Sequence, residues 1–310
     1  MTTLRFDDVV ARIASAATFS DLESFVGAGG NEAYRRLVKI VHPDAAPAGR
    51  TATATQAFAS LSALWAGPKV TTGDVADLHE QGRTLVKLPR SPADNDLMAA
   101  EGRALKALDG NAYMPRLVET FTHEDENRAR RTVNVLERQQ GFVSLVDVLR
   151  ACPGGLDPRD VAWMWRRLLT ALGWAHRAGF VHGAVLAPHV LIHPAEHGLV
   201  LIDWCYSVTP GVRIPALVSE FRDDYPPEVT GRQPAGPATD IYLATVLMRR
   251  LMRDPPPALR RFADGCLYDA PRMRPQDAWA LLAEFDELLE DLYGPRRFRP
   301  FAMPAHHHGR

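Results

Sequence analysis

The sequence has few cysteines, and they are widely spaced. Cys152, Cys205 and Cys266 are the three cysteines among 310 residues, and no Cys-x-x-Cys pair occurs. This pattern argues against a disulfide framework or a cysteine-based zinc site and is typical of reduced thiols in a cytoplasm. The simplest interpretation is three small, buried apolar side chains.

The sequence also lacks an excess of either charge and lacks a long apolar segment. The 36 Lys and Arg residues balance 37 Asp and Glu residues, so no long-range field favours nucleic acid or an anionic membrane. No window approaches about eighteen uninterrupted apolar residues, and no basic flank precedes an apolar run at the N-terminus. We therefore expect no nucleic-acid partner, no membrane insertion and a cytoplasmic location.

Hydrophobic residues make up 46% of the chain, which is enough for a packed core in two domains. Small and turn-forming residues at 45–55 and 65–69 predict that an N-terminal helical unit ends near residue 67. A small mixed lobe should follow, and helices should dominate beyond Gly154-Gly155. The predicted strands are 70–81, 82–89, 115–124, 130–139, 189–192 and 198–203, and the predicted helices are 96–108, 157–172, 239–252 and 275–293.

Several short segments occur in a characteristic order between residues 70 and 293. They are LVKLPR, VLERQQGFVSL, HRAGFVHGAVLAPHVLI, LIDW, YPPEV, PATDIYLATVL and MRPQDA. Together they resemble the eukaryotic-type protein kinase domain of the small bacterial sort. The resemblance implies a two-lobed fold, with Lys87, Glu101, Glu137 and Asp203 as nucleotide-binding candidates and Asp203 as a magnesium ligand. On their own, Lys87 and Glu101 would be read as solvated surface residues.

The same resemblance assigns structural roles in the helical lobe. His182 belongs to the catalytic loop, and Asp240 braces that loop from the first turn of a buried helix. Glu228 and Arg274 form an ion pair.

Three positions of the predicted catalytic loop depart from the kinase pattern. Ala184 replaces the aspartate that orients and deprotonates the acceptor, Leu186 replaces the loop lysine, and His189 replaces the second magnesium ligand. Loss of a positioned base typically lowers the rate about 10²- to 10⁴-fold. Imidazole is a poor substitute because Mg²⁺ prefers oxygen ligands.

The predicted phosphate-covering loop is degraded as well. VTTGDVADLHEQ contains only Gly73, whereas a kinase uses several glycines whose backbone amides approach the phosphates. The sequence therefore indicates a pseudokinase, with ATP and Mg²⁺ bound weakly or not at all. The alternative is residual catalysis through a carboxylate recruited from Asp223-Asp224 or Glu196.

The segment EAYRRLVKIVHPDAAP is the second informative stretch. Tyr34, Leu37, Val38 and Val41 form an apolar stripe of a helix that ends at a His-Pro-Asp turn. TATQAFASLSALWA has helical spacing too and should form an antiparallel partner. This hairpin resembles the J-domain of chaperone-activating proteins, although FSDLESFV matches the first J-domain helix poorly. The other interpretation is a helix end with an aspartate in a turn.

The J-domain resemblance implies an acidic heat-shock ATPase chaperone as partner and no catalysis by this unit. The residues that would dock on the chaperone are Arg35, Arg36, Lys39, His42, Pro43 and Asp44.

The predicted fold class is α+β, a bilobal kinase-like fold preceded by a small all-α J-like hairpin. The predicted domains are 1–67, 68–295 (small lobe 68–140, helical lobe 141–295) and a flexible tail, 296–310, with three histidines. The expected function is a non-catalytic adaptor or regulator that brings a chaperone to an unknown protein client. Alternatives are an ATP-binding serine/threonine kinase with residual or atypical activity and a nucleotide sensor.

Overall fold

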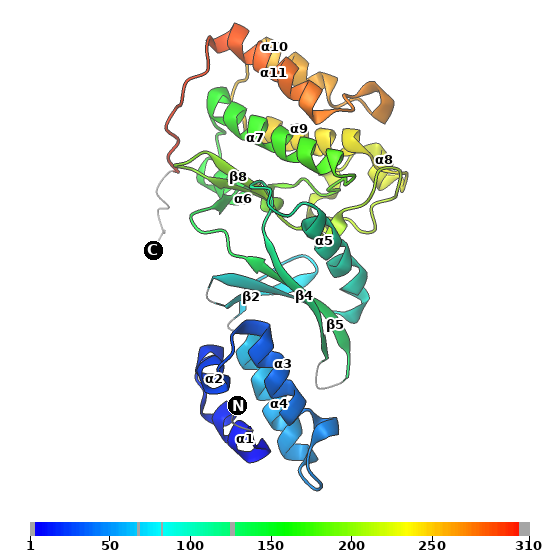
Figure 1. Cartoon of the computed structure of the whole chain (residues 1–310). Helices are drawn as coiled ribbons and strands as arrows, with labels where there is room; N and C mark the ends of the chain where they lie inside the picture. Colours follow the sequence, from blue (N-terminus) through cyan, green and yellow to red (C-terminus); the bar gives the residue numbers. More distant parts are fainter. Residues whose placement is uncertain (1–3, 67–68, 82, 125–127, 304–310) are drawn as a thin grey trace. The chain divides into compact units, whose positions relative to one another are not determined.

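The computed structural model describes residues 4–66, 69–81, 83–124 and 128–303 (Figure 1). The chain is a mixed α+β protein in which N-terminal helices precede antiparallel strands and C-terminal helices follow. It forms two compact units. The first contains residues 1–98 and 118–138, and the second contains residues 99–117 and 139–310.

The first unit begins with helices that include the predicted hairpin. The helix preceding the His-Pro-Asp turn and its partner are present as α3 and α4, and two further helices precede them. The second of these begins at a capping box in which Thr18 and Asp21 exchange side-chain to backbone hydrogen bonds. The helices are α1 (Phe6–Ser15), α2 (Phe19–Val26), α3 (Gly30–Val41) and α4 (Thr51–Ala66).

The first unit also contains a five-stranded sheet in the order β1-β2-β3-β5-β4. The segment predicted as one strand over 70–81 is divided at Gly73, where a turn separates β1 from β2. In the antiparallel register, Lys87 of β3 lies opposite Asn134 of β5. The strands are β1 (Lys69–Thr72), β2 (Ala76–Gln81), β3 (Thr84–Pro89), β4 (Leu117–Glu124) and β5 (Arg130–Glu137).

The helices and this sheet share one hydrophobic core. Val86 of β3 and Val133 of β5 belong to the same buried cluster as Leu37 of α3 and Trp65 of α4. The indole ring of Trp65 packs edge-on against Phe121 of β4, with ring centroids 4.8 Å apart. The boundary predicted at residue 67 therefore lies within one compact unit rather than between two cores.

The second unit is mainly helical and contains a three-stranded sheet, β6-β7-β8. Its longest helix, α7, begins at the predicted cap Asp157, whose carboxylate accepts from the backbone N–H of Arg159. The apolar stripe of α7 packs against α9 and α11, where Trp165 lies 4.8 Å from the ring of Phe285. The elements are α5 (Asn95–Ala107, shared with the first unit), β6 (Val143–Ser144), α6 (Leu145–Ala151), α7 (Pro158–Arg177), β7 (Val190–His193), β8 (Gly198–Leu201), α8 (Pro227–Thr230), α9 (Pro237–Leu251), α10 (Pro257–Gly265) and α11 (Ala278–Tyr293).

The beginning of the predicted flexible tail is packed against α7. Arg299 forms ion pairs with Asp157 and Asp160, each at 3.1 Å. Phe301 is buried beside Trp163. The described part of 296–310 is thus anchored by charge and aromatic contacts, and the three histidines at 306–308 lie outside the described residues.

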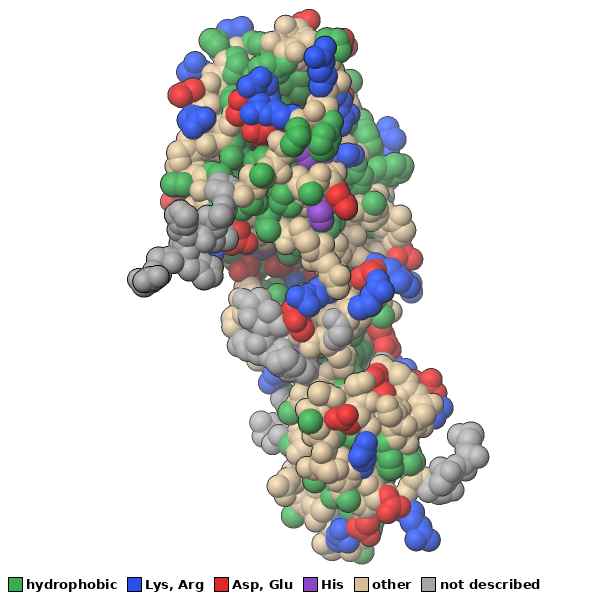
Figure 2. Space-filling view, turned by 90° about the vertical axis from the view of Figure 1, so that its left-hand side faces the viewer, with side chains coloured by type: hydrophobic (Ala, Val, Ile, Leu, Met, Phe, Trp, Pro, Cys, Tyr) green, Lys and Arg blue, Asp and Glu red, His purple; other side chains and the backbone are tan. Residues whose placement is uncertain are grey.

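Acidic and basic side chains are interspersed on the face shown in Figure 2, in keeping with the balanced composition. Within the described ranges, no helix has the length and apolar character needed to cross a bilayer.

Candidate functional site

The segment after α7 is fixed by a single buried carboxylate. Asp240, in the first turn of α9, accepts hydrogen bonds from the backbone N–H groups of His182 and Gly183 at 2.7 and 2.8 Å. The ring of His176 lies 3.0 Å from the same carboxylate. The side chain of Asp240 is fully buried, so these donors replace its lost hydration. The predicted bracing contact is present.

The imidazole of His182 is held in its neutral form. Its Nε2 lies 2.9 Å from the carbonyl oxygen of Ile202, which can only accept, so Nε2 carries the proton. Its Nδ1 accepts from the backbone N–H of Ala184 at 3.2 Å. Burial lowers the pKa of His182 from 6.5 to about 4. Trp204 packs edge-on against the ring at 4.6 Å and fixes its orientation.

The two apolar residues of this loop that differ from the kinase pattern are buried in the core. Ala184 and Leu186 are 0% and 1% exposed, respectively. The backbone N–H of Leu186 donates to the carbonyl oxygen of Ala184 at 2.9 Å, which closes a tight turn. A methyl and an isobutyl group can neither accept a proton nor bind a phosphate, so these positions supply packing alone.

His189 pairs with the aspartate that was predicted to bind magnesium. Its Nε2 lies 3.2 Å from Oδ2 of Asp203, and its Nδ1 lies 2.8 Å from the carbonyl oxygen of Ala184. The carbonyl oxygen of Ala184 can only accept, so Nδ1 carries a proton, while Nε2 faces the Asp203 carboxyl group. The side chains are 4% and 12% exposed, so the pair is shielded from water. The Asp203 carboxyl group is thus already in contact with the His189 ring.

Asp203 also belongs to a group of potential metal ligands. The ligand atoms of Glu101, Asp203 and Cys205 lie within 4.8 Å of one another. Mg²⁺ requires an octahedral shell of oxygens, and a thiol is too soft a ligand for that ion. Because Asp203 is also committed to His189, the residues of this unit do not fit a kinase-type magnesium site.

The carboxylates that could replace the missing base are Asp223, Asp224 and Glu196, and each is either exposed or already paired. Asp224 forms a two-pronged ion pair with Arg250, including a 2.9 Å contact. Asp223 is solvent-exposed. Glu196 is exposed in the turn between β7 and β8, where its backbone N–H donates to His193. Asp224 is therefore neutralised in place.

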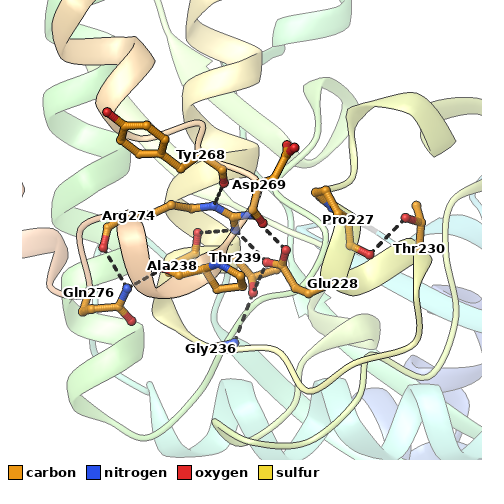
Figure 3. Close-up of polar contacts among 11 residues, drawn as sticks. Pro227, Glu228, Thr230, Gly236, Ala238, Thr239, Tyr268, Asp269, Arg274 and Gln276 are labelled. Atoms are coloured by element: carbon orange, nitrogen blue, oxygen red, sulfur yellow. Dashed lines mark hydrogen bonds and ion pairs between the residues drawn. The ribbon is translucent and has the colours of Figure 1, made fainter.

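The predicted pair of Glu228 and Arg274 is the centre of a buried network (Figure 3). The guanidinium donates to both carboxylate oxygens at 2.7 and 2.9 Å. Its remaining N–H groups reach the carbonyl oxygens of Tyr268 and Asp269, while Thr239 donates to Glu228 at 3.0 Å. Side-chain exposures of 0% and 5% make this a fully desolvated, fully bonded ion pair.

The other nucleotide-binding candidates are divided between the units. Lys87 lies on β3 and is only 5% exposed, which contradicts a solvated surface role. Glu137 lies at the end of β5, 3.9 Å from Arg83. Glu101 of α5 is fully buried in the second unit, as is most of Asp203. Neither unit by itself contains all four candidates.

The turn between β1 and β2 is closed by a cation. Arg90 donates to the carbonyl oxygens of Gly73, at 2.6 Å, and of Asp74. The backbone N–H of Gly73 donates to Ala76 at 2.8 Å, so the turn spans only residues 73–75. A turn this short, whose first amide is bonded to Ala76, has room for few amides that could approach a phosphate.

The residues predicted to dock on a chaperone are held on the surface of the first unit. Arg35 of α3 forms an ion pair with Glu119 of β4 at 3.2 Å, and its side chain is 63% exposed. Arg36 pairs with Glu32 one turn earlier in α3. Lys39 is exposed. The basic face is present, and part of its charge is paired within the chain.

The His-Pro-Asp turn follows α3 as predicted. The Nδ1 of His42 accepts from the backbone N–H of Asp44 at 3.2 Å, and the His42 ring packs edge-on against Phe58. Pro43 begins a short 3₁₀ turn. The Asp44 carboxylate pairs with Arg128 at 2.9 Å and remains 61% exposed.

The charged partners that lie outside each motif could not be predicted from the sequence. Glu119, Arg128 and Arg90 occupy strands or turns far along the chain from the residues that they contact. Single charged residues of this kind carry no spacing signal. Only the three-dimensional pairing could reveal them.

No protein-family model matches the chain, and no curated protein sequence matches it significantly. The kinase and J-domain resemblances therefore depend on the motifs and on the geometry described above.

Proposed function

We propose that the chain is a non-catalytic, protein-kinase-like regulator whose N-terminal helices recruit an ATP-dependent heat-shock chaperone. The observation that carries the first part is the buried contact between His189 and Asp203, at 3.2 Å. A kinase needs an anionic carboxylate at this point to hold the metal that neutralises the transferred phosphate. Here the His189 ring lies against that carboxyl group, in the place where a metal would bind.

The order of elements supports a kinase-like fold. A five-stranded sheet interrupted by α5 precedes a mainly helical unit. Asp240 beneath the loop and the buried pair of Glu228 and Arg274 match the structural residues of that family. Structural residues are thus retained, while the base at position 184 and the metal ligand at position 189 are absent.

A second candidate function is nucleotide sensing without phosphate transfer. Lys87 and Glu101 are buried rather than solvated, as the nucleotide-binding pair of the kinase family would be. A residual kinase activity is a third candidate, but Ala184 provides no base.

A phosphotransfer assay with radiolabelled ATP and Mg²⁺ tests the first part of the proposal. We expect no autophosphorylation and no labelling of generic substrates. The paired control is Ala184→Asp with His189→Asn, which returns the base and the second magnesium ligand to the loop. Stoichiometric labelling of the unaltered chain that disappears in Lys87→Ala would overturn the proposal. Magnesium-dependent ATP stabilisation without labelling would favour the nucleotide sensor.

The chaperone part requires the full chain, because α1 to α4 share their core with the sheet. A fragment ending at residue 68 would expose Tyr34 and Trp65, which are buried in the intact protein. We expect the full chain to stimulate the ATPase of a heat-shock chaperone from the same cell, less so as salt rises. His42→Gln should abolish stimulation with little change in melting temperature. Equal stimulation by both proteins would leave the turn without this role.

A further inference from the structure

A groove runs between α3 and the edge strand β4 in the first unit. One hollow, of about 560 Å³, is lined by Arg35, Arg36, Lys39 and Glu119, together with Gly29 and Glu32. A second hollow, of about 380 Å³, shares Arg35 and Lys39 and continues toward Val38, Phe58, Phe121 and His123. The shared residues make the two hollows adjacent parts of one groove, which we call the α3–β4 groove.

One side of this groove is an unpaired strand edge. The strand order places β4 last in the sheet, and no other strand among the described residues pairs with its outer edge. An edge strand directs half of its backbone N–H and C=O groups away from its neighbour, where they can pair with another chain. Residues 117–124 contain no proline or lysine, which commonly protect such edges. The strand is therefore a template for an added strand.

The charges of the groove leave one cation available. Arg35 pairs with Glu119, and Arg36 pairs with Glu32. Glu124, at the far end, pairs with Arg130 at 3.2 Å. Lys39 forms no ion pair with the part of the chain that the structure describes. His42 and His123 also border the second hollow.

The second hollow also has an apolar part. Val38 and Phe121 are partly buried, and Phe58 is buried in the core, so their side chains form a floor rather than a mobile surface. A bulky apolar side chain placed there would lose its hydration against a preformed wall.

We propose that the α3–β4 groove binds an extended segment of a partner protein as a sixth strand of the sheet. Backbone hydrogen bonds to β4 hold the segment, a carboxylate of the segment pairs with Lys39, and an apolar side chain fills the hollow beside Phe121. Side chains of a strand alternate between faces, and those two positions apart lie about 7 Å from each other. The bound segment therefore carries an acidic and a bulky apolar residue at i and i+2. This binding mode is independent of any chaperone.

Selection of random nine-residue peptides on the immobilised full chain tests the proposal. We expect enrichment of an acidic and an aromatic or branched aliphatic residue two positions apart. The selected peptide should lose about tenfold in affinity for Lys39→Glu and no more than twofold for Lys106→Glu, an exposed lysine of α5. Methylating the peptide amides that face β4 should abolish binding, because those N–H groups are the donors of the added strand.

Hydrogen exchange provides a second measurement. The peptide should protect amides of 117–124 and leave those of α9 unchanged. Three outcomes overturn the proposal: no peptide is enriched, the enriched peptide tolerates both amide methylation and Lys39→Glu, or sedimentation shows that β4 edges already pair two copies of the chain at micromolar concentration.

Discussion

The ion pair near α9 and the ion pair beside α3 both join a guanidinium to a carboxylate, but they differ in their exposure to water. The side chains of Arg274 and Glu228 are 0% and 5% exposed, whereas those of Arg35 and Glu119 are 63% and 29% exposed. Breaking a buried pair leaves an uncompensated charge, which costs several kcal/mol, while an exposed pair contributes about 0–1 kcal/mol. The contacts around α9 therefore maintain the fold, and those around α3 leave charges accessible to a partner.

The largest effect on stability is expected when the buried guanidinium of Arg274 is removed. Arg274→Ala should lower the free energy of unfolding by about 3–5 kcal/mol, because Glu228 would remain buried without its partner. Urea unfolding measures the loss. Arg249→Ala is the matched control, since Arg249 pairs with Asp264 at 3.0 Å with both side chains about half exposed. Equal effects of the two substitutions would contradict the assignment of stability to the buried network.

The apolar contact between α4 and the sheet tests whether the first unit is one cooperative body. Trp65 is 3% exposed and packs against Tyr34 and Phe121. Trp65→Ala should cost about 3 kcal/mol and lower the unfolding midpoint of helices and strands together. Hydrogen exchange resolves the two elements. If the helical amides lost protection while those of β3 and β5 kept theirs, the helices would be a separate module.

Much of the architecture could be predicted from the sequence because it depends on local patterns. The stripe of α7, the cap at Asp157 and the alternation in β4 each depend on residues within one element. The boundary at residue 67 was predicted from turn-forming residues alone. Such residues mark the end of a helix, but they do not reveal that Trp65 faces Phe121, more than fifty positions later.

The residues of the candidate site could be identified from the sequence, but their contacts with distant segments could not. Ala184 and His189 could be identified by counting along the loop, and the pair of Glu228 and Arg274 followed from the resemblance. The sequence could not show that His189 approaches Asp203 or that Arg90 closes the turn at Gly73. Those contacts depend on the fold of separate segments, and a single histidine or arginine has no pattern.

A smaller effect on stability is expected from the neutral side chain of His182, whose backbone N–H donates to Asp240. Burial lowers the pKa of His182 to about 4 in the folded protein, against 6.5 when unfolded. The unfolded chain therefore binds more protons between these values, so stability is lost as pH falls. From pH 7 to pH 5 this residue should remove about 2 kcal/mol. Urea unfolding of His182→Gln should show a pH dependence weaker by that amount, and an unchanged dependence would contradict a lowered pKa of His182 in the fold.

The smallest effect on stability is expected at the His-Pro-Asp turn, where Asp44 carries an exposed charge. Asp44 pairs with Arg128 at 2.9 Å, but the two side chains are 61% and 75% exposed. Asp44→Asn keeps the shape of the turn and removes the charge, so the free energy of unfolding should change by less than about 1 kcal/mol. The difference should vanish near 0.5 M salt, where the Debye length is about 4 Å. Urea unfolding at low and high salt measures both quantities, and Asp264→Asn, in the exposed pair with Arg249, provides a matched control.

If the α3 face serves binding rather than stability, Asp44→Asn should abolish chaperone stimulation in a protein as stable as the original. A loss above about 2 kcal/mol that persisted at high salt would place Asp44 among the structural charges.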